Sequence, residues 1–238
     1  MPVTATLISH TPEPEKLVAA AGKLCYSNAS ATKLLDGLDA EKTAYFVDML
    51  SSQGHMSTLE HASFTFAIEG VSRSLLAQIT RHRIASFSVQ SQRYVPLKNF
   101  GHVIPQEIED DAEAKAEYMA AMEFAENSYN KITEILQAKG KTKKQAIENA
   151  RAVLPGACET KMMLTMNARS LHNFFALRCC MRAQAEIRTL ADLMLAEVKA
   201  AAPLLFAKAG PPCIKAGCPE GALSCAKMAE MREKYAAR

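Results

Sequence analysis

A long helical pattern from Asp110 to Ala138 constrains the fold of this chain more than any other sequence feature. Acidic residues stand in its first turn, and Lys139 and Gly140 follow its last residue, as expected at the two ends of a complete helix. A second helix is predicted from Thr142 to Val153, where a Pro-Gly pair follows and ends it. The chain therefore needs a fold that can accommodate long helices.

Shorter segments indicate a few separated strands between further helices. Strands are expected where apolar residues alternate or β-prone residues gather, at residues 2–9, 62–68 and 160–166. Gly70 is expected to end the second of these strands. Helices are expected at residues 15–24, 40–52, 73–81, 167–178 and 182–199. The stretch 84–94 is rich in serine and glutamine without a clean period, so it is predicted to be a loop.

This order of elements predicts an α+β (or α/β) single domain over residues 1–238, with long helices and a small mixed sheet. The 49% hydrophobic and 22% charged residues are ordinary for a globular protein, and a net charge of +3 is too small to indicate a nucleic-acid partner. The first residues lack the pattern of a signal peptide, and no apolar run reaches the roughly 18 residues of a membrane span. A cytoplasmic protein without a membrane partner is predicted.

The chain has 7 cysteines, which are expected to be free thiols in a reducing compartment. Cys213, Cys218 and Cys225 are separated by four and six residues, without the tight pairs of common zinc sites. No metal is therefore predicted. Residues 210–238 are interpreted as a turn-rich, cysteine-containing C-terminal tail to which no role is assigned.

The densest polar cluster is the segment from Arg81 to Tyr94, with three arginines, one histidine and three serines. Arginine offers a planar fork for phosphate oxygens, and loop serines and backbone N–H groups add neutral donors. The alternative is a solvated basic surface. Apolar flanking residues such as Phe66 and Leu75 favour the phosphate interpretation, which suits two phosphate-bearing ligands or one diphosphate.

Two further clusters carry polar groups. In the segment 167–173, Arg169 and Asn173 are four residues apart and share one helix face, where an amide can bind a flavin or pyrimidine edge. Considered alone, this segment is better explained as a helix capped by Asn167. The segment 54–61 holds His55, Glu60 and His61, but its spacing is not that of HExxH, so loop histidines are preferred over a metal site.

Together the three clusters resemble the flavin-dependent thymidylate synthases. The family signature, Arg-His-Arg followed after seven residues by Ser, stands here as Arg81-His82-Arg83 and Ser91. A GHxxxxEH element at 54–61 and an NARSLxN element at 167–173 also match, and the resemblance covers about residues 40–200. It implies reductive methylation of dUMP to dTMP, with FAD as cofactor and NADPH and 5,10-methylenetetrahydrofolate as co-substrates. It also implies a homotetramer with active sites shared between subunits.

The resemblance also implies roles for individual residues. The FAD-binding set is His55, Ser57, Arg81, His82, Arg83, Val89, Asn167, Arg169 and Asn173. The dUMP-binding set is Gln78, Arg81, Ser91, Gln92, Arg93, Arg151 and Arg178. Glu60 is expected with His55 and Ser57 at the flavin and folate side. Many relatives carry Glu or Gln at position 89, so a contact from Val89 is expected to come from its backbone.

Arg178 is the predicted catalytic residue. A guanidinium bonded to the pyrimidine edge favours ionisation at N3 and raises electron density at carbon 5, where the new carbon is added. Ser91 has no apparent general base, so it is expected to bind dUMP rather than act as a nucleophile. Two alternatives stay open: a non-catalytic nucleotide- or RNA-binding module built on the loop 81–93, and a flavoenzyme acting on another nucleotide.

Overall fold

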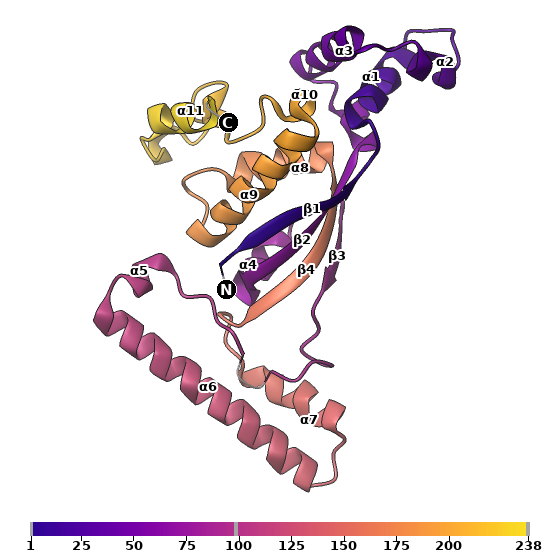
Figure 1. The fold of residues 1–238 in the computed structure, drawn as a ribbon. Coiled ribbons are helices and arrows are strands. Elements are labelled where there is room, and N and C mark those ends of the chain that lie inside the picture. The colour runs from indigo at the N-terminus through magenta and orange to yellow at the C-terminus, as the bar shows by residue number, and fades with distance from the viewer. Residues whose placement is uncertain (1, 98–99, 237–238) are drawn as a thin grey trace. The chain divides into compact units, whose positions relative to one another are not determined.

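The computed structural model describes residues 2–97 and 100–236, which form an α+β arrangement of helices and one small sheet (Figure 1). The strands are β1 (Thr4–His10), β2 (Ser63–Ser72), β3 (Ala85–Val89) and β4 (Glu159–Asn167). The α-helices are α1 (Pro14–Leu24), α2 (Ala31–Asp36), α3 (Ala40–Ser52), α4 (Arg73–Ile79), α5 (Gln106–Glu109), α6 (Ala112–Ala138), α7 (Lys143–Ala150), α8 (Ala168–Arg178), α9 (Ala185–Ala201), α10 (Pro203–Phe206) and α11 (Met228–Ala236). Short 3-10 helices are η1 (Met56–His61), η2 (Arg151–Val153), η3 (Pro212–Ile214) and η4 (Gly221–Leu223).

The four strands pair in the order β1-β2-β4-β3. Thr65 and Thr165 join their hydroxyls at 2.9 Å between β2 and β4, and the Gln90 N–H donates to the Lys161 carbonyl at 3.0 Å beyond the end of β3. In each pair the end of one strand meets the start of the other, so the sheet is antiparallel. The prediction of a mixed sheet was wrong in this respect, because periodicity locates strands and leaves their pairing direction open.

Two strand boundaries also differ from the sequence prediction. Strand β3 lies inside the predicted loop 84–94, where exposed Ser86 and Ser88 alternate with half-buried neighbours. Strand β2 does not end at Gly70 but continues through it, with a φ of 70° at that glycine. Glycine adopts this conformation without the steric cost that a side chain brings, so the strand can continue through this position.

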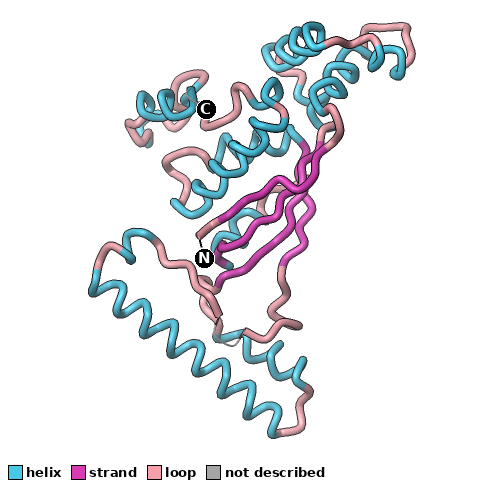
Figure 2. The backbone as a smooth tube through the Cα atoms, viewed as in Figure 1, coloured by secondary structure: helices cyan, strands magenta, loops and turns pink. Residues whose placement is uncertain are grey.

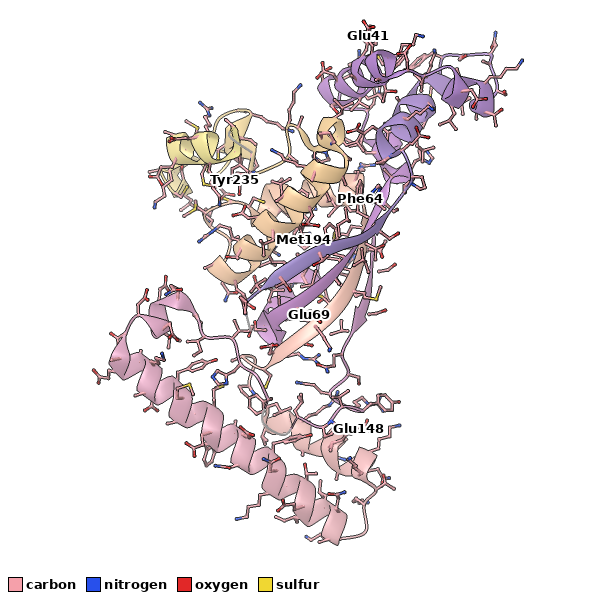
Figure 3. The ribbon with its side chains drawn as sticks, viewed as in Figure 1. Glu41, Phe64, Glu69, Glu148, Met194 and Tyr235 are labelled. Carbon is pink, nitrogen blue, oxygen red and sulfur yellow. The ribbon has the colours of Figure 1, made fainter. Side chains whose placement is uncertain are left out.

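The described residues fall into two compact units. The second unit is formed by Thr4–Ala67, His82–Phe87 and the described part of Met163–Arg238. Its core holds Phe64 and Phe206, whose rings meet edge-on at 5.3 Å, together with Phe175. Figure 3 labels Phe64 on β2 and Met194 on α9, and both side chains are fully buried. Burying each such side chain stabilises the fold by about 1.5–3 kcal/mol.

The first unit contains the described residues of Met1–Val3, Ile68–Arg81 and Ser88–Met162. Its long helix α6 packs against α7, as the tube in Figure 2 shows. Tyr129, Ile147 and Ala150 form the buried centre of this pairing, and the Tyr129 hydroxyl accepts a hydrogen bond from the Leu97 N–H at 3.2 Å. The predicted helix at 110–138 is therefore confirmed, with its start two residues later at Ala112.

The C-terminal segment is more ordered than a turn-rich tail. It contains η3, η4 and α11, and Met231 and Tyr235 of α11 are buried. None of the helices in residues 2–97 and 100–236 combines the length and apolar character that a membrane span requires.

Candidate active site

Arg178 is positioned by a hydrogen bond to His82 within the second unit. It is the last residue of α8, and its Nε donates a hydrogen bond to Nε2 of His82 at 3.0 Å. The His82 ring in turn packs edge-on against Phe174, one helical turn before Arg178, at 5.0 Å between centroids. Because Nε is already engaged, the terminal nitrogens of the guanidinium are the donors left for a ligand.

The buried ring of His82 is held in its neutral form. Only 8% of this residue is exposed, and burial, followed by the positive charge of Arg178, lowers the pKa of His82 to about 4. At neutral pH the ring therefore carries one proton, and the hydrogen bond from Arg178 to Nε2 assigns that proton to Nδ1. Arg178 thus gains a hydrogen-bond acceptor and keeps its full positive charge.

The residues around His82 combine exposed charge with backbone strain. Arg81 and Arg83 are exposed, so both guanidiniums are accessible to an anion. Ile84 has a φ of 60° and is 72% exposed. A β-branched residue rarely adopts this left-handed conformation, and strain of this kind persists where surrounding structure fixes the backbone.

The second and third sequence clusters meet within the second unit. Arg169 of α8 pairs with Glu60 of η1, with Nη1 and Oε1 2.5 Å apart. Both side chains stay about half exposed, at 53% and 41%. Asn173, one turn further along α8, is exposed on the face of Arg169. These side chains form a polar surface of one cation, one carboxylate and one amide.

Of three other predicted FAD ligands, two form local hydrogen bonds and one is exposed. Asn167 caps α8, with its Oδ1 accepting from the Ser170 N–H at 2.8 Å, so its amide NH₂ is the remaining donor. His55, which precedes η1, bonds through Nε2 to Oε1 of Gln53 at 3.2 Å. Ser57 is exposed on η1.

The first unit holds most of the predicted dUMP ligands. Arg93 forms an ion pair with Glu148 of α7, with Nε and Oε1 2.7 Å apart but not aligned for a hydrogen bond, and Figure 3 labels Glu148 on that helix. The Ser91 hydroxyl accepts from the Arg93 N–H at 3.2 Å. Arg151 is exposed at the start of η2, while Gln78 on α4 is partly exposed. Gln92 follows Ser91 and is partly exposed, as is Val89 at the end of β3.

The sequence named these side chains as candidates but did not predict their pairings. The Arg178–His82, Arg169–Glu60 and Arg93–Glu148 contacts each join residues at least 55 positions apart, and no local pattern encodes such a pairing. Glu148 was absent from the predicted site. The sequence offers little to single out Glu148, because it is one acidic residue on a predicted helix. Among residues 2–97 and 100–236, no three His, Cys, Asp or Glu side chains already stand in an arrangement that could hold a metal ion.

A pocket of about 390 Å³ lies beside Arg178 in the second unit. The end of α8 and the C-terminal segment form its walls, through residues that include Leu177, Arg182, Pro212 and Glu220. Arg182 and Glu220 form an ion pair at its edge. Arg178 therefore faces a concave surface of a size that suits a small ligand.

Comparison with known proteins places this chain in a family. Residues 6–204 match the model of the thymidylate synthase complementing protein family. The chain is 52% identical to the flavin-dependent thymidylate synthase of Clostridium tetani over 99% of this chain and 98% of that one. It is 45% identical to the enzyme of the same name from Geobacter sulfurreducens over 96% of each chain.

The fold agrees with a solved structure. The flavin-dependent thymidylate synthase of Helicobacter pylori, complexed with FAD and dUMP, matches with a TM-score of 0.64 and 26% identity, covering 87% of this chain and 99% of that one. Fold and site together define an α+β protein whose guanidinium groups are available to anionic ligands. The chain belongs to the flavin-dependent thymidylate synthases, a family of FAD-dependent methyltransferases.

Proposed function

We propose that the chain catalyses the reductive methylation of dUMP to dTMP, with 5,10-methylenetetrahydrofolate as carbon donor, NADPH as hydride source and FAD as cofactor. The observation that carries this proposal is the 52% identity to the Clostridium tetani enzyme over nearly the full length of both chains. The FAD and dUMP bound to the Helicobacter pylori relative support the choice of cofactor and substrate.

The donor groups of the proposed FAD ligands fit FAD chemically. Exposed Arg81 of the first unit and exposed Arg83 and Arg169 of the second supply guanidiniums for a diphosphate, and Asn173 supplies an amide for the edge of a ring. His55, Ser57, Val89 and Asn167 complete the proposed FAD set, with Asn167 contributing its free NH₂ group. His82, being largely buried, acts through Arg178 as much as through the cofactor. Bound FAD would supply hydride transfer between NADPH and the pyrimidine.

The proposed dUMP set is Gln78, Arg81, Ser91, Gln92, Arg93, Arg151 and Arg178. Arg93 differs from the other arginines because Glu148 already neutralises it. A nucleotide phosphate that reaches Arg93 therefore has to compete with this carboxylate or join it in a shared network. The Ser91 hydroxyl, which accepts from the Arg93 N–H, can still donate its own proton to a phosphate oxygen.

Arg178 is the proposed catalytic residue. Its terminal nitrogens would donate to the pyrimidine edge and stabilise the negative charge that develops there, which raises electron density at carbon 5. Charge stabilisation of this kind is worth about 3–4 kcal/mol for each donor. The neutral His82 ring fixes the guanidinium plane without cancelling its charge. Arg178 itself stays protonated throughout and transfers no proton.

The proposal extends to assembly and location. We propose a cytoplasmic homotetramer whose active sites are shared between subunits. The sheet supports this in part, because β4 presents exposed Lys161 and Met163 on the face opposite its buried residues, and Met163 is 49% exposed. Light scattering of the purified protein at increasing concentration tests the assembly, and a monomer at all concentrations would contradict it.

The decisive experiment measures dTMP formation from dUMP and 5,10-methylenetetrahydrofolate with NADPH, with and without added FAD. We expect a yellow protein and FAD-dependent product. A colourless protein that stays inactive after FAD is added would contradict the proposal, and salt-sensitive RNA binding by that protein would indicate the binding-module alternative. A flavin spectrum without dUMP-dependent oxidation of the reduced flavin would indicate another flavoenzyme.

A further inference from the structure

A sulfur-lined pocket lies between the end of α8 and the C-terminal segment, within the second unit. Seven of the nine residues around it carry sulfur, and the other two are Arg182 and Ser224. The sulfur-bearing residues are Cys180, Cys213, Cys218, Cys225, Met181, Met228 and Met231. All four cysteines are free thiols in the structure. So many soft donors around one small space indicate a ligand that prefers sulfur.

The four cysteines come from separate places in the chain. Cys180 directly follows the cap of α8, and Cys213 belongs to η3. Cys218 stands in the turn after η3, and Cys225 precedes α11. The sequence prediction of no metal considered only the three cysteines of the tail. The fold adds a fourth, Cys180, which is 33 positions before Cys213 and invisible to a spacing rule.

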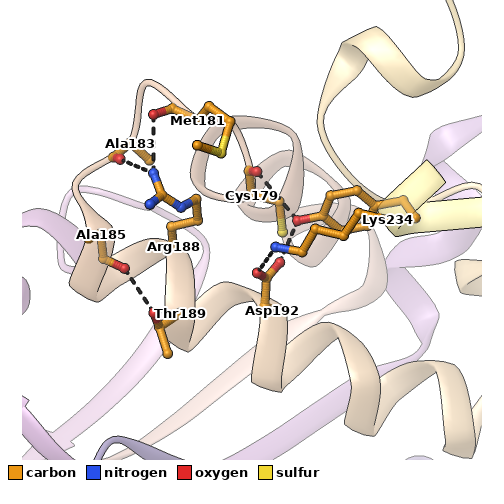
Figure 4. Close-up of polar contacts among 9 residues, drawn as sticks. Cys179, Met181, Ala183, Ala185, Arg188, Thr189, Asp192 and Lys234 are labelled. Atoms are coloured by element: carbon orange, nitrogen blue, oxygen red, sulfur yellow. Dashed lines mark hydrogen bonds and ion pairs between the residues drawn. The ribbon is translucent and has the colours of Figure 1, made fainter. Parts of the chain in front are cut away.

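Two arginines hold the backbone that carries these thiols. Nη1 of Arg188 donates to the carbonyls of Met181 and Ala183, both at 3.1 Å, which fixes the turn after Cys180 (Figure 4). Arg232 of α11 donates through Nε to the Cys213 carbonyl and through Nη2 to the Ala216 carbonyl, both at 3.0 Å. The walls of the pocket are therefore fixed by contacts that involve no thiol.

The C-terminal helix is anchored in the same way. The Tyr235 hydroxyl donates to Asp192 of α9 and lies 3.4 Å from the Cys179 carbonyl, and Lys234 pairs with the same carboxylate (Figure 4). Tyr235 is only 4% exposed, so this anchor is buried. It holds α11, and with it the segment of Cys225, beside the end of α8.

We propose that Cys180, Cys213, Cys218 and Cys225 together bind one thiophilic metal ion, Zn²⁺ by preference, as a four-thiolate site. Four sulfur ligands in tetrahedral arrangement select Zn²⁺ or an iron–sulfur cluster. The free volume of the pocket is about 10 Å³, the space of a single water-sized particle, which favours one ion over a cluster. Binding converts the thiols to thiolates and releases their protons to solvent.

The site has to close when the ion binds. No three candidate ligand side chains already stand in a metal-binding arrangement within the described residues, so the thiols must turn toward a common centre at the Zn–S distance of about 2.3 Å. Cys180, Cys218 and Cys225 are only half-buried, which leaves their side chains room to change rotamer. Because Cys180, Cys213 and Cys218 also line the pocket of Arg178, the ion would stiffen one wall of that pocket.

The first experiment measures metal content. The full-length protein is expressed with zinc supplied, purified without chelators and analysed for zinc, iron and acid-labile sulfide. We expect about one zinc per chain and no sulfide. Cys218→Ser and Cys225→Ser should each lose most of the zinc, whereas Cys25→Ser, which changes an exposed cysteine outside the pocket, should keep it. Zinc retained by the Cys218→Ser/Cys225→Ser double variant, or sulfide in the unaltered protein, would overturn the proposal.

The second experiment uses the unaltered chain, because serine variants of a structural site can fail to fold. The metal-free protein is titrated with Cd²⁺, and the ultraviolet thiolate-to-metal band should saturate at one equivalent. Alkylation with mass mapping should then show protection at the four pocket cysteines and none at Cys25. A disulfide between any two of the four thiols, or a titration without this band, would contradict the metal site. Neither readout depends on dTMP formation, so the outcome is independent of the proposed catalytic function.

Discussion

Arg178 and Arg93 are both proposed to bind the same nucleotide, yet the protein holds them in opposite ways. Arg178 is bonded to a buried neutral histidine at 3.0 Å, and Arg93 is paired with the half-exposed carboxylate of Glu148 at 2.7 Å. A neutral acceptor orients a guanidinium and leaves its charge available, whereas a nearby carboxylate offsets that charge. On the proposed function, this difference suits Arg178 to stabilise charge during the reaction and Arg93 to exchange partners when dUMP binds.

The strongest test of this difference is Arg178→Ala. Removal of one preorganised charge-stabilising donor costs about 10²–10³ in kcat, so turnover should fall by at least that factor. The flavin spectrum should be retained, because Arg178 is not in the proposed FAD set. Steady-state dTMP formation and the absorption spectrum measure the two effects. Arg178→Lys serves as a second variant, since it keeps the charge but loses the planar fork, and near-normal turnover by either variant would contradict the assignment.

The next test removes the neutral partner. His82→Phe keeps a ring against Phe174 but leaves Nε of Arg178 without its acceptor, so we expect kcat to fall about 10- to 100-fold with a smaller change in the KM for dUMP. His82→Gln restores an acceptor and should recover part of the loss. Equal activity of the Phe and Gln variants would show that His82 does not act through Arg178.

The neutral state of His82 also predicts how stability depends on pH. Burial lowers the pKa of His82 to about 4, and burial likewise lowers the pKa of His172 to about 4, against about 6.5 in an unfolded chain. Between these values the unfolded state binds more protons, so stability falls as pH decreases from about 6.5 to about 4. The free energy of unfolding, measured with urea at several pH values, should change with pH by about 1 kcal/mol per pH unit less in His82→Gln than in the unaltered protein. If this free energy depends on pH equally in both proteins, the buried ring of His82 is not neutral.

The same contrast explains what the sequence could and could not predict. Helix α6 was predictable because one segment carried its own charges and end signals, and α3 was predicted with its observed bounds. Strand β3 was missed because its alternation covers only five residues within a polar stretch, and α2 was missed because six residues are too few to show a helical period. The candidate arginines were named through the resemblance to a family. Their partners His82 and Glu148 were not assigned as partners, because those contacts depend on packing between distant segments.

At Arg93, Glu148→Gln should improve the use of dUMP, whereas the changes at His82 impair turnover. Loss of the carboxylate frees the guanidinium for phosphate, so the KM for dUMP should fall about 3-fold at low salt, while kcat stays near its original value. Stability should change by less than about 1 kcal/mol, as for other half-exposed ion pairs. Glu109→Gln is the matched control, because it breaks the similarly exposed pair with Lys115 outside the proposed site. A weaker dUMP affinity in Glu148→Gln would mean that the carboxylate orients Arg93 rather than masking it.

The smallest expected effect concerns the backbone beside His82. Ile84, two residues later, has a φ of 60°, whereas no residue from 88 to 97 has a positive φ among those the structure describes. Ile84→Gly should relieve about 1–2 kcal/mol of strain and lose somewhat less to the greater entropy of unfolded glycine, for a net gain of about 0.5 kcal/mol. Ile8→Gly, at an exposed position of β1, should instead destabilise by about 1 kcal/mol. If the strained backbone holds His82 against Arg178, kcat of Ile84→Gly falls although the protein becomes more stable. If the variant is more stable and its kcat is unchanged, the strain at Ile84 does not position Arg178.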